Sequence, residues 1–86
     1  DLTFKFSDSY SSFVVTENTD GNIVVASSKG LYEIDPKTLK VIASNLFSNS
    51  LLYLKNIYID SQNRIFISSG YNGVVYYFKS FDSEPI

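Results

Sequence analysis

The 86-residue chain contains no cysteine and no histidine. Without cysteine there is no disulfide framework and no thiolate metal site. Without histidine the chain lacks the side chain that most often serves as a general base or as a zinc ligand. A Ser-His-Asp triad is impossible within this chain. The sequence therefore predicts no catalytic residue, no metal site and no cofactor site.

Clusters of positive charge and long apolar runs are also missing. The seven Lys and Arg residues are scattered along the chain, and nine acidic residues bring the net charge to −2. A protein that binds a phosphate backbone needs a basic face, so nucleic acid is not an expected partner. No run approaches the roughly 18 apolar residues of a membrane span, so no transmembrane segment is predicted.

β-Forming residues dominate what is present. Hydrophobic residues make up 44% of the chain and aromatic residues 16%, which is the composition of a folded domain. β-Branched and aromatic residues occur in short runs separated by turn residues, and helical periodicity is nearly absent. We predict strands at Leu2–Phe6, Phe13–Glu17, Asn22–Ser27, Leu31–Asp35, Leu39–Ala43, Lys55–Asp60, Arg64–Ser69 and Val74–Ser80.

One connection differs from the short turns between the other strands. Residues 44–54 mix polar loop residues with apolar ones. We expect a long crossing loop that places Leu51, Leu52 and Leu54 against the core, with a short helical turn as the alternative. Three of the remaining connections carry the turn pairs Asp20-Gly21, Asp35-Pro36 and Asn72-Gly73.

The second half of the chain repeats the first. TENTDGNIVVASS at 16–28 aligns with YIDSQNRIFISS at 58–69 with an offset of 42 residues, so that Val25 falls on Ile67. After one inserted residue, an offset of 43 places Gly30 on Gly73. A period of about 40–50 residues with four short strands per unit is typical of a β-propeller blade. One such sheet cannot bury both of its faces, so blades stack face to face.

TDGNIVVASSKGLYEID at 19–35 resembles the blades of two-component-regulator propellers, with an Asp-Gly-Asn turn, an apolar strand, a small-residue step and Gly-Leu-Tyr. It is also similar to NHL-type and quinoprotein-like blades, in which LYEIDPKTLKVIAS at 31–44 is the outer hairpin. The resemblance covers Phe13 to about Ser80. One departure is that Val24 and Phe66 stand where the family usually has Trp in the central strand. The resemblance implies an extracytoplasmic location.

We therefore expect an all-β fold of two consecutive four-stranded antiparallel propeller-type blades. Residues 1–12 form an N-terminal strand and loop, 13–54 the first blade, and 55–86 a second, incomplete blade. Propellers have about four to eight blades, so two cannot close a ring. Three arrangements stay open: an excerpt of a larger propeller, a homo-oligomeric ring of copies, and a small sandwich. Leu2–Phe6 is a candidate for the missing outer strand of a blade.

The carboxylates at turns have a structural interpretation. Asp20, Asp35 and Asp60 are expected to accept backbone N–H bonds that close the turns. Paired acid–base catalysis needs two carboxylates in one pocket, which their spacing does not predict. A calcium loop needs more carboxylates at alternating positions than these turns offer.

Aromatic residues provide the candidate recognition surface. Alternation along the last predicted strand places Tyr77 on the face opposite Phe78, and tyrosine is favoured at interfaces. Tyr10 and Tyr71 fall in predicted loops, where ligand contacts concentrate, and Asn72 shares a turn with Tyr71. The candidate recognition residues are therefore Tyr10, Tyr71, Asn72 and Tyr77.

The sequence as a whole favours a non-catalytic propeller repeat module that recognises or scaffolds a protein or small-molecule ligand. Its other partners are the remaining blades of a larger propeller or further copies of the chain. By resemblance, one such role is the sensor region of a two-component regulator. Two alternatives stay open: a fragment of a lactonase-like or quinoprotein-like propeller enzyme with its catalytic residues elsewhere, and a small self-assembling β protein.

Overall fold

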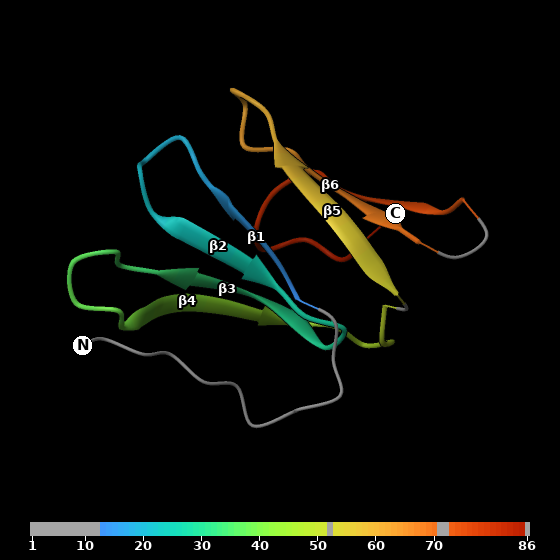
Figure 1. Ribbon diagram of the computed structural model, residues 1–86, viewed down its shortest axis with the longest axis horizontal. Helices are drawn as coiled ribbons and strands as arrows, with labels where there is room; N and C mark the ends of the chain where they lie inside the picture. Colours follow the sequence, from blue (N-terminus) through green and yellow to red (C-terminus); the bar gives the residue numbers. More distant parts are fainter. Residues whose placement is uncertain (1–12, 52, 71–72, 86) are drawn as a thin grey trace.

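The computed structural model describes residues 13–51, 53–70 and 73–85, and within them the chain folds into two antiparallel sheets without any helix (Figure 1). The first sheet has the order β1-β2-β3-β4, with β1 at Val14–Glu17, β2 at Ile23–Ala26, β3 at Gly30–Ile34 and β4 at Val41–Leu46. The second has the order β5-β6-β7, with β5 at Leu54–Ile59, β6 at Ile65–Ser69 and β7 at Val75–Phe78. The predicted all-β class is confirmed. The predicted strand Leu2–Phe6 lies outside the described residues.

The predicted bounds of the fourth strand were wrong at both ends. Leu39 does not begin the strand, because its backbone is left-handed (φ 58°) and its N–H donates to the Asp35 carbonyl at 2.8 Å. At the other end β4 continues through residues 44–46, where polar side chains suggested a loop. Asn45 lies in the strand, and its Nδ2 donates to the carbonyls of Phe81 and Ser83, at 2.8 Å each.

The core lies between the two sheets. The first sheet contributes residues such as Val24 and Leu31, and the second contributes Ile65, Ile67 and Phe78. Each of these side chains is at most 1% exposed, and burial of one contributes about 1.5–3 kcal/mol. The sheets approach most closely along β1 and β5, which run side by side (Figure 1).

The crossing loop between the sheets closes one side of this core. Leu51 and Leu54 are 3% and 8% exposed, so the predicted burial of both is confirmed. Leu54 belongs to β5 rather than to the loop, and Leu52 lies outside the described residues.

The two sheets share one register along their first two strands. Val15 pairs with Val25 in the first sheet, and Ile57 pairs with Ile67 in the second, which is the predicted offset of 42. In the third strands the offset is 44 and not the predicted 43. The Ser27 N–H donates to the Gly30 carbonyl at 2.9 Å, but the Ser69 N–H donates to the Val74 carbonyl at 2.8 Å. The second hairpin loop is therefore two residues longer, and Gly30 corresponds to Val74.

Equivalent residues of the two sheets lie on different sides of the interface. In the first sheet Val24 faces the core, whereas Phe66 at the equivalent position is outside the core cluster. In the second sheet Ile67 faces the core, whereas the equivalent Val25 lies on the outer face of the first sheet, where it is 6% exposed. The sheets therefore pack head to tail, because opposite faces of the same repeat unit meet.

Gly30 lies close to the backbone of β4, and this close approach leads to a stability prediction. A Cβ at Gly30 would lie 2.8 Å from the backbone oxygen of Asn45, whereas a Cβ at Gly70 would lie 3.6 Å from its nearest neighbour. We expect Gly30→Ala to reduce the free energy of unfolding by about 1–3 kcal/mol, because β3 and β4 must move apart. Gly70→Ala is the matched control, with little expected change. Urea unfolding measures both, and equal stabilities of the two variants would contradict this account of Gly30.

Candidate functional site

Two equivalent turns form one end of the molecule. The Asn18 Oδ1 accepts the backbone N–H groups two and four residues later, at 3.0 Å each. The Asp60 Oδ1 accepts the N–H groups at the same positions of its own turn, at 3.0 and 2.9 Å. Gly21 and Asn63 each adopt the left-handed conformation that the turn needs (φ 83° and 60°). The predicted turn-closing role of Asp60 is confirmed, but in the first turn Asn18 takes this role instead of Asp20.

These two turns are joined across the space between the sheets. The Thr19 Oγ1 donates a hydrogen bond of 3.0 Å to the Asn63 Oδ1. Because the sheets pack at the level of β1 and β5, the turns that follow these strands end side by side. Their tips form the rim of a cleft that opens between the two sheets.

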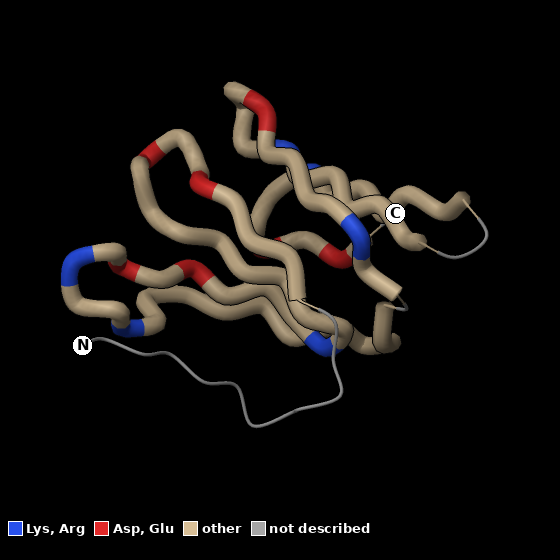
Figure 2. The backbone as a smooth tube through the Cα atoms, in the orientation of Figure 1, with Lys and Arg blue, Asp and Glu red and all other residues tan. Residues whose placement is uncertain are grey.

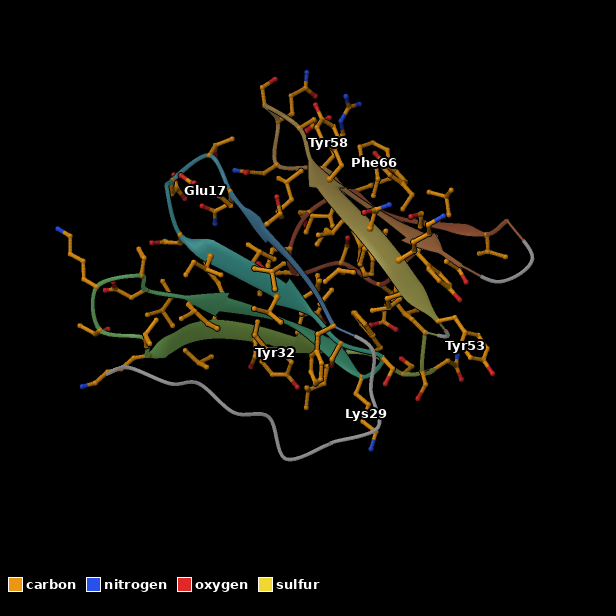
Figure 3. The ribbon with its side chains drawn as sticks, viewed as in Figure 1. Glu17, Lys29, Tyr32, Tyr53, Tyr58 and Phe66 are labelled. Carbon is orange, nitrogen blue, oxygen red and sulfur yellow. The ribbon has the colours of Figure 1, made fainter. Side chains whose placement is uncertain are left out.

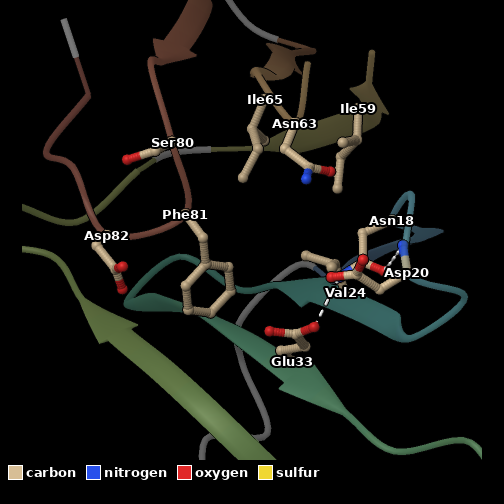
Figure 4. A pocket seen from close by; sticks show the side chains of 10 residues that line it. All are labelled: Asn18, Asp20, Val24, Glu33, Ile59, Asn63, Ile65, Ser80, Phe81 and Asp82. Carbon is tan, nitrogen blue, oxygen red and sulfur yellow. Dashed lines mark hydrogen bonds between the residues drawn. The ribbon is translucent and has the colours of Figure 1, made fainter. Parts of the chain in front are cut away.

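The cleft is a cavity of about 250 Å³ between the first sheet, the second sheet and the C-terminal segment (Figure 4). Val24 and Glu33 lie on the first-sheet wall, and Ile59 and Ile65 on the second-sheet wall. The remaining lining residues are Asn18, Asp20, Asn63, Ser80, Phe81 and Asp82. The site therefore combines segments from the whole described length of the chain.

Three of the six polar side chains described in the lining of the cleft are carboxylates. Glu33 points into it, and its Oε2 accepts a hydrogen bond from the Asn18 Nδ2 at 2.7 Å (Figure 4). The same oxygen accepts a second hydrogen bond from the Asn22 Nδ2 at 2.9 Å. Asp20 and Asp82 also line the cavity, and none of its described lining residues is Lys or Arg. Figure 2 shows acidic residues, in red, at the turn between β1 and β2 and at the turn between β5 and β6. The side chains here can accept hydrogen bonds and attract positive charge, and the Phe81 ring adds an apolar surface.

Tyr77 is the one predicted recognition residue that the structure describes, and it is not among the described residues that line this cleft. Tyr77 lies on the outer face of the second sheet, where its ring centroid is 5.1 Å from that of Phe66. The Phe66 ring is in turn 6.2 Å from that of Tyr58, and Figure 3 shows Tyr58 and Phe66 on the side away from the first sheet. The predicted separation of Tyr77 from the buried Phe78 is thus observed. Tyr10, Tyr71 and Asn72 lie outside the described residues.

A second cavity of about 360 Å³ lies at the opposite end of the sheets, beside the crossing loop. Leu51 and Tyr76 contribute to its lining, together with Glu84, whose Oε1 accepts a hydrogen bond of 2.6 Å from the Ser48 hydroxyl. This bond ties the C-terminal segment to the crossing loop. Glu84 is the single carboxylate among the described residues that line this cavity, so we regard the first cleft as the stronger candidate site.

Sequence reasoning missed the cleft, although one signal pointed to it. In the predicted strand 31–35, Leu31 and Glu33 share a face, so a buried Leu31 places the Glu33 carboxylate on the core side. Among the described residues, no group of three or more His, Cys, Asp or Glu is placed to hold a metal ion. The same residues include no helix that could cross a membrane.

Comparison with known proteins adds no family assignment: no family model, no curated protein and no solved structure matches this chain.

Asp60 and Arg64 form an ion pair at the tip of the second turn. The Arg64 Nε lies 2.6 Å from the Asp60 Oδ2, and the Asp60 side chain is 13% exposed. Burial acts to raise the pKa of Asp60, but hydrogen bonds from the backbone and side chain of Arg64 and from the Gln62 backbone lower that pKa below its usual value. The pKa of Arg64 is raised by the same hydrogen bond and charge.

This ion pair predicts a pH-dependent contribution to stability. Because the pKa of Asp60 is lower in the folded state, the contribution is present above the usual aspartate pKa and is lost as the pH falls through the folded-state value. Asp60→Asn keeps the oxygen that closes the turn but removes the charge. We expect wild type to exceed Asp60→Asn in stability at pH 7 and the difference to vanish near about pH 2.

Urea unfolding at both pH values measures this difference. Arg64→Gln removes the cation but keeps the backbone N–H groups that bond to Asp60, so it should reduce the same pH-dependent part of the stability without removing it. An Asp60→Asn variant with the pH dependence of wild type would contradict the role given to the pair.

Proposed function

We propose that this chain is a non-catalytic β-propeller repeat module that recognises a protein or small-molecule ligand, and that the cleft between its sheets is the recognition site. The observation that carries the proposal is the cleft itself, which the two equivalent turns and the C-terminal segment build at one end of the sheets. Loops at one end of a rigid β scaffold are the usual place for binding residues.

The propeller part of the proposal is supported by the repetition of the sheets. Both sheets are antiparallel meanders, and their first two strands have the same register at an offset of 42 residues. The first strands, β1 and β5, lie nearest each other. Radial repetition of one sheet places equivalent strands next to each other in this way.

The recognition part is supported by the chemistry of the lining. The carboxylates of Asp20, Glu33 and Asp82 accept hydrogen bonds, and the Phe81 ring offers a surface for an apolar or cationic group. These groups suit a ligand that donates hydrogen bonds and carries positive charge, such as a guanidinium or ammonium group of a protein segment or small molecule. Among the lining residues that the structure describes, none is a typical nucleophile with a base beside it, so we propose binding without catalysis.

Titration with arginine amide, followed by NMR, tests this proposal. We expect concentration-dependent shifts of amide signals from the cleft, because the probe matches the acceptors and the negative charge. Glu33→Gln keeps the shape of the side chain but removes its charge, and should weaken binding about tenfold or more, since a hydrogen bond to a charged group contributes about 1.5–3 kcal/mol.

Two controls make the titration specific. Glu84→Gln removes a carboxylate outside the cleft and should leave binding unchanged. Acetate has the opposite charge and should produce no shifts in the cleft. Shifts that are equal for acetate, or that lie away from the cleft, would contradict the proposed site.

A further inference from the structure

The second sheet has one strand fewer than the first. Among the described residues, β7 pairs with β6 on one side and with no strand on the other, whereas its counterpart β3 lies between β2 and β4. The first sheet shows which backbone groups take part in pairing with a fourth strand. The Phe47 N–H donates to the Lys29 carbonyl at 2.9 Å, and alternation therefore directs the backbone N–H and C=O groups of Leu31 and Glu33 toward β4.

The equivalent backbone groups of β7 point away from its own sheet. At the offset of 44 residues, Leu31 and Glu33 correspond to Val75 and Tyr77. The Ser69 N–H donates to the carbonyl of the residue before Val75 at 2.8 Å, so that residue bonds to β6. Alternation then turns the N–H and C=O groups of Val75 and Tyr77 to the opposite edge. Backbone groups at such an edge are a template for an added strand.

β7 lacks the features that normally keep an edge strand from pairing with another chain, which are charged residues, proline and β-bulges. The other three edge strands of the two sheets have such a feature. β1 carries Glu17, β5 carries Lys55, and the pairing of β4 with β3 contains a register shift after Glu33. β7 has the sequence VYYF, and its pairing with β6 has no register shift. It is therefore the least protected edge of the described sheets.

A second copy of the chain fits this edge because the edge is complementary to itself. If two β7 strands lie antiparallel with Tyr76 opposite Tyr76 on a twofold axis, Val75 of each copy lies opposite Tyr77 of the other. These two facing pairs are of the hydrogen-bonded type, in which each pair exchanges two N–H···O=C bonds. A β-branched residue opposite an aromatic one is also a favourable cross-strand pair, and Val75 is 58% exposed in the single chain.

We propose that two copies of the chain pair through β7 and join their three-stranded sheets into one antiparallel sheet with the order β5-β6-β7-β7-β6-β5. A sheet of this size is ordinary. The aromatic row on the outer face, in which Phe66 pairs with Tyr77, continues into Val75 of the second copy. Part of this edge borders open space, because Val75 and Tyr76 line the cavity of about 360 Å³. The twofold pairing uses the β7 edge of both copies and therefore ends at the dimer.

Light scattering coupled to size-exclusion chromatography tests this inference on the full 86-residue chain. Between micromolar and millimolar concentration, we expect the mass to rise from that of one chain, 9.7 kDa, to twice that value and to rise no further. Val75→Pro removes an N–H that the dimer needs and that β6 does not use, and proline is tolerated in an edge strand at such a position. This variant should stay monomeric at every concentration.

Two control variants locate the contact. Val15→Pro makes the same substitution in another edge strand, β1, at a residue of similar exposure (61%), and should dimerise like wild type. Tyr58→Lys changes the outer face of the second sheet at β5, where the side chain is 63% exposed, and should also dimerise. Loss of the dimer in Tyr58→Lys would place the contact on the sheet face and overturn pairing through the edge. Circular dichroism and thermal unfolding verify that each variant is folded.

Hydrogen exchange measured by NMR on wild type needs no variant. In the dilute monomer the amide protons of Val75 and Tyr77 should exchange faster than that of Tyr76, whose N–H faces β6. Where the mass doubles, both should become protected. A wild-type chain that stays monomeric at millimolar concentration would overturn the inference, as would a dimer without this protection or a folded Val75→Pro variant that still dimerises. Ligand binding in the cleft is measured separately, so the two proposals can fail independently.

Discussion

Coverage of both faces of the central strands is the constraint on which the rest of this structure depends. In β2 the consecutive residues Val24 and Val25 are both buried although they point to opposite sides of the sheet. A strand of this kind needs a packing layer on each side, which a single four-stranded meander cannot provide. Stacking of the second sheet covers one side. That stacking also brings the two equivalent turns together at one end of the sheets. The cleft lies beside these turns, between the two sheets.

The strands could be predicted because runs of β-branched and aromatic residues, separated by turn residues, match the strands of the folded chain. The errors occurred where the local sequence and the tertiary structure disagree. Gly30 and Gly73 look equivalent in the sequence, but they are glycines for different reasons. Gly30 faces a neighbouring backbone oxygen, whereas Gly73 has a left-handed backbone (φ 63°). Matching them shifted the predicted register of the third strands by one residue. The prediction that Leu39 begins the fourth strand was wrong for a related reason, because a leucine in the sequence gives no indication of a positive φ.

The site was less predictable than the fold because its residues meet only through packing. Asn18 and Glu33 are joined within the first sheet, but Phe81 and Asp82 reach the cleft because Asn45 holds the carbonyls of the C-terminal segment. No local sequence pattern predicts such a contact. Alternation did separate the faces of β7 correctly, so Tyr77 was placed on an exposed face, but a rule of period two cannot say which partner covers that face.

The turn between β1 and β2 and the turn between β5 and β6 have the same backbone conformation but different abilities to form hydrogen bonds with a neighbouring turn. Gly21 and Asn63 both supply the left-handed residue, yet only Asn63 has a side chain that can accept the hydrogen bond from Thr19 on the adjacent turn. In the second repeat the residue equivalent to Thr19 is Ser61, which also carries a hydroxyl. A tandem array of second repeats would therefore contain a donor and an acceptor at every junction and could form a continuous belt of hydrogen bonds around its rim. An array of first repeats would have hydroxyls facing glycines and no such belt.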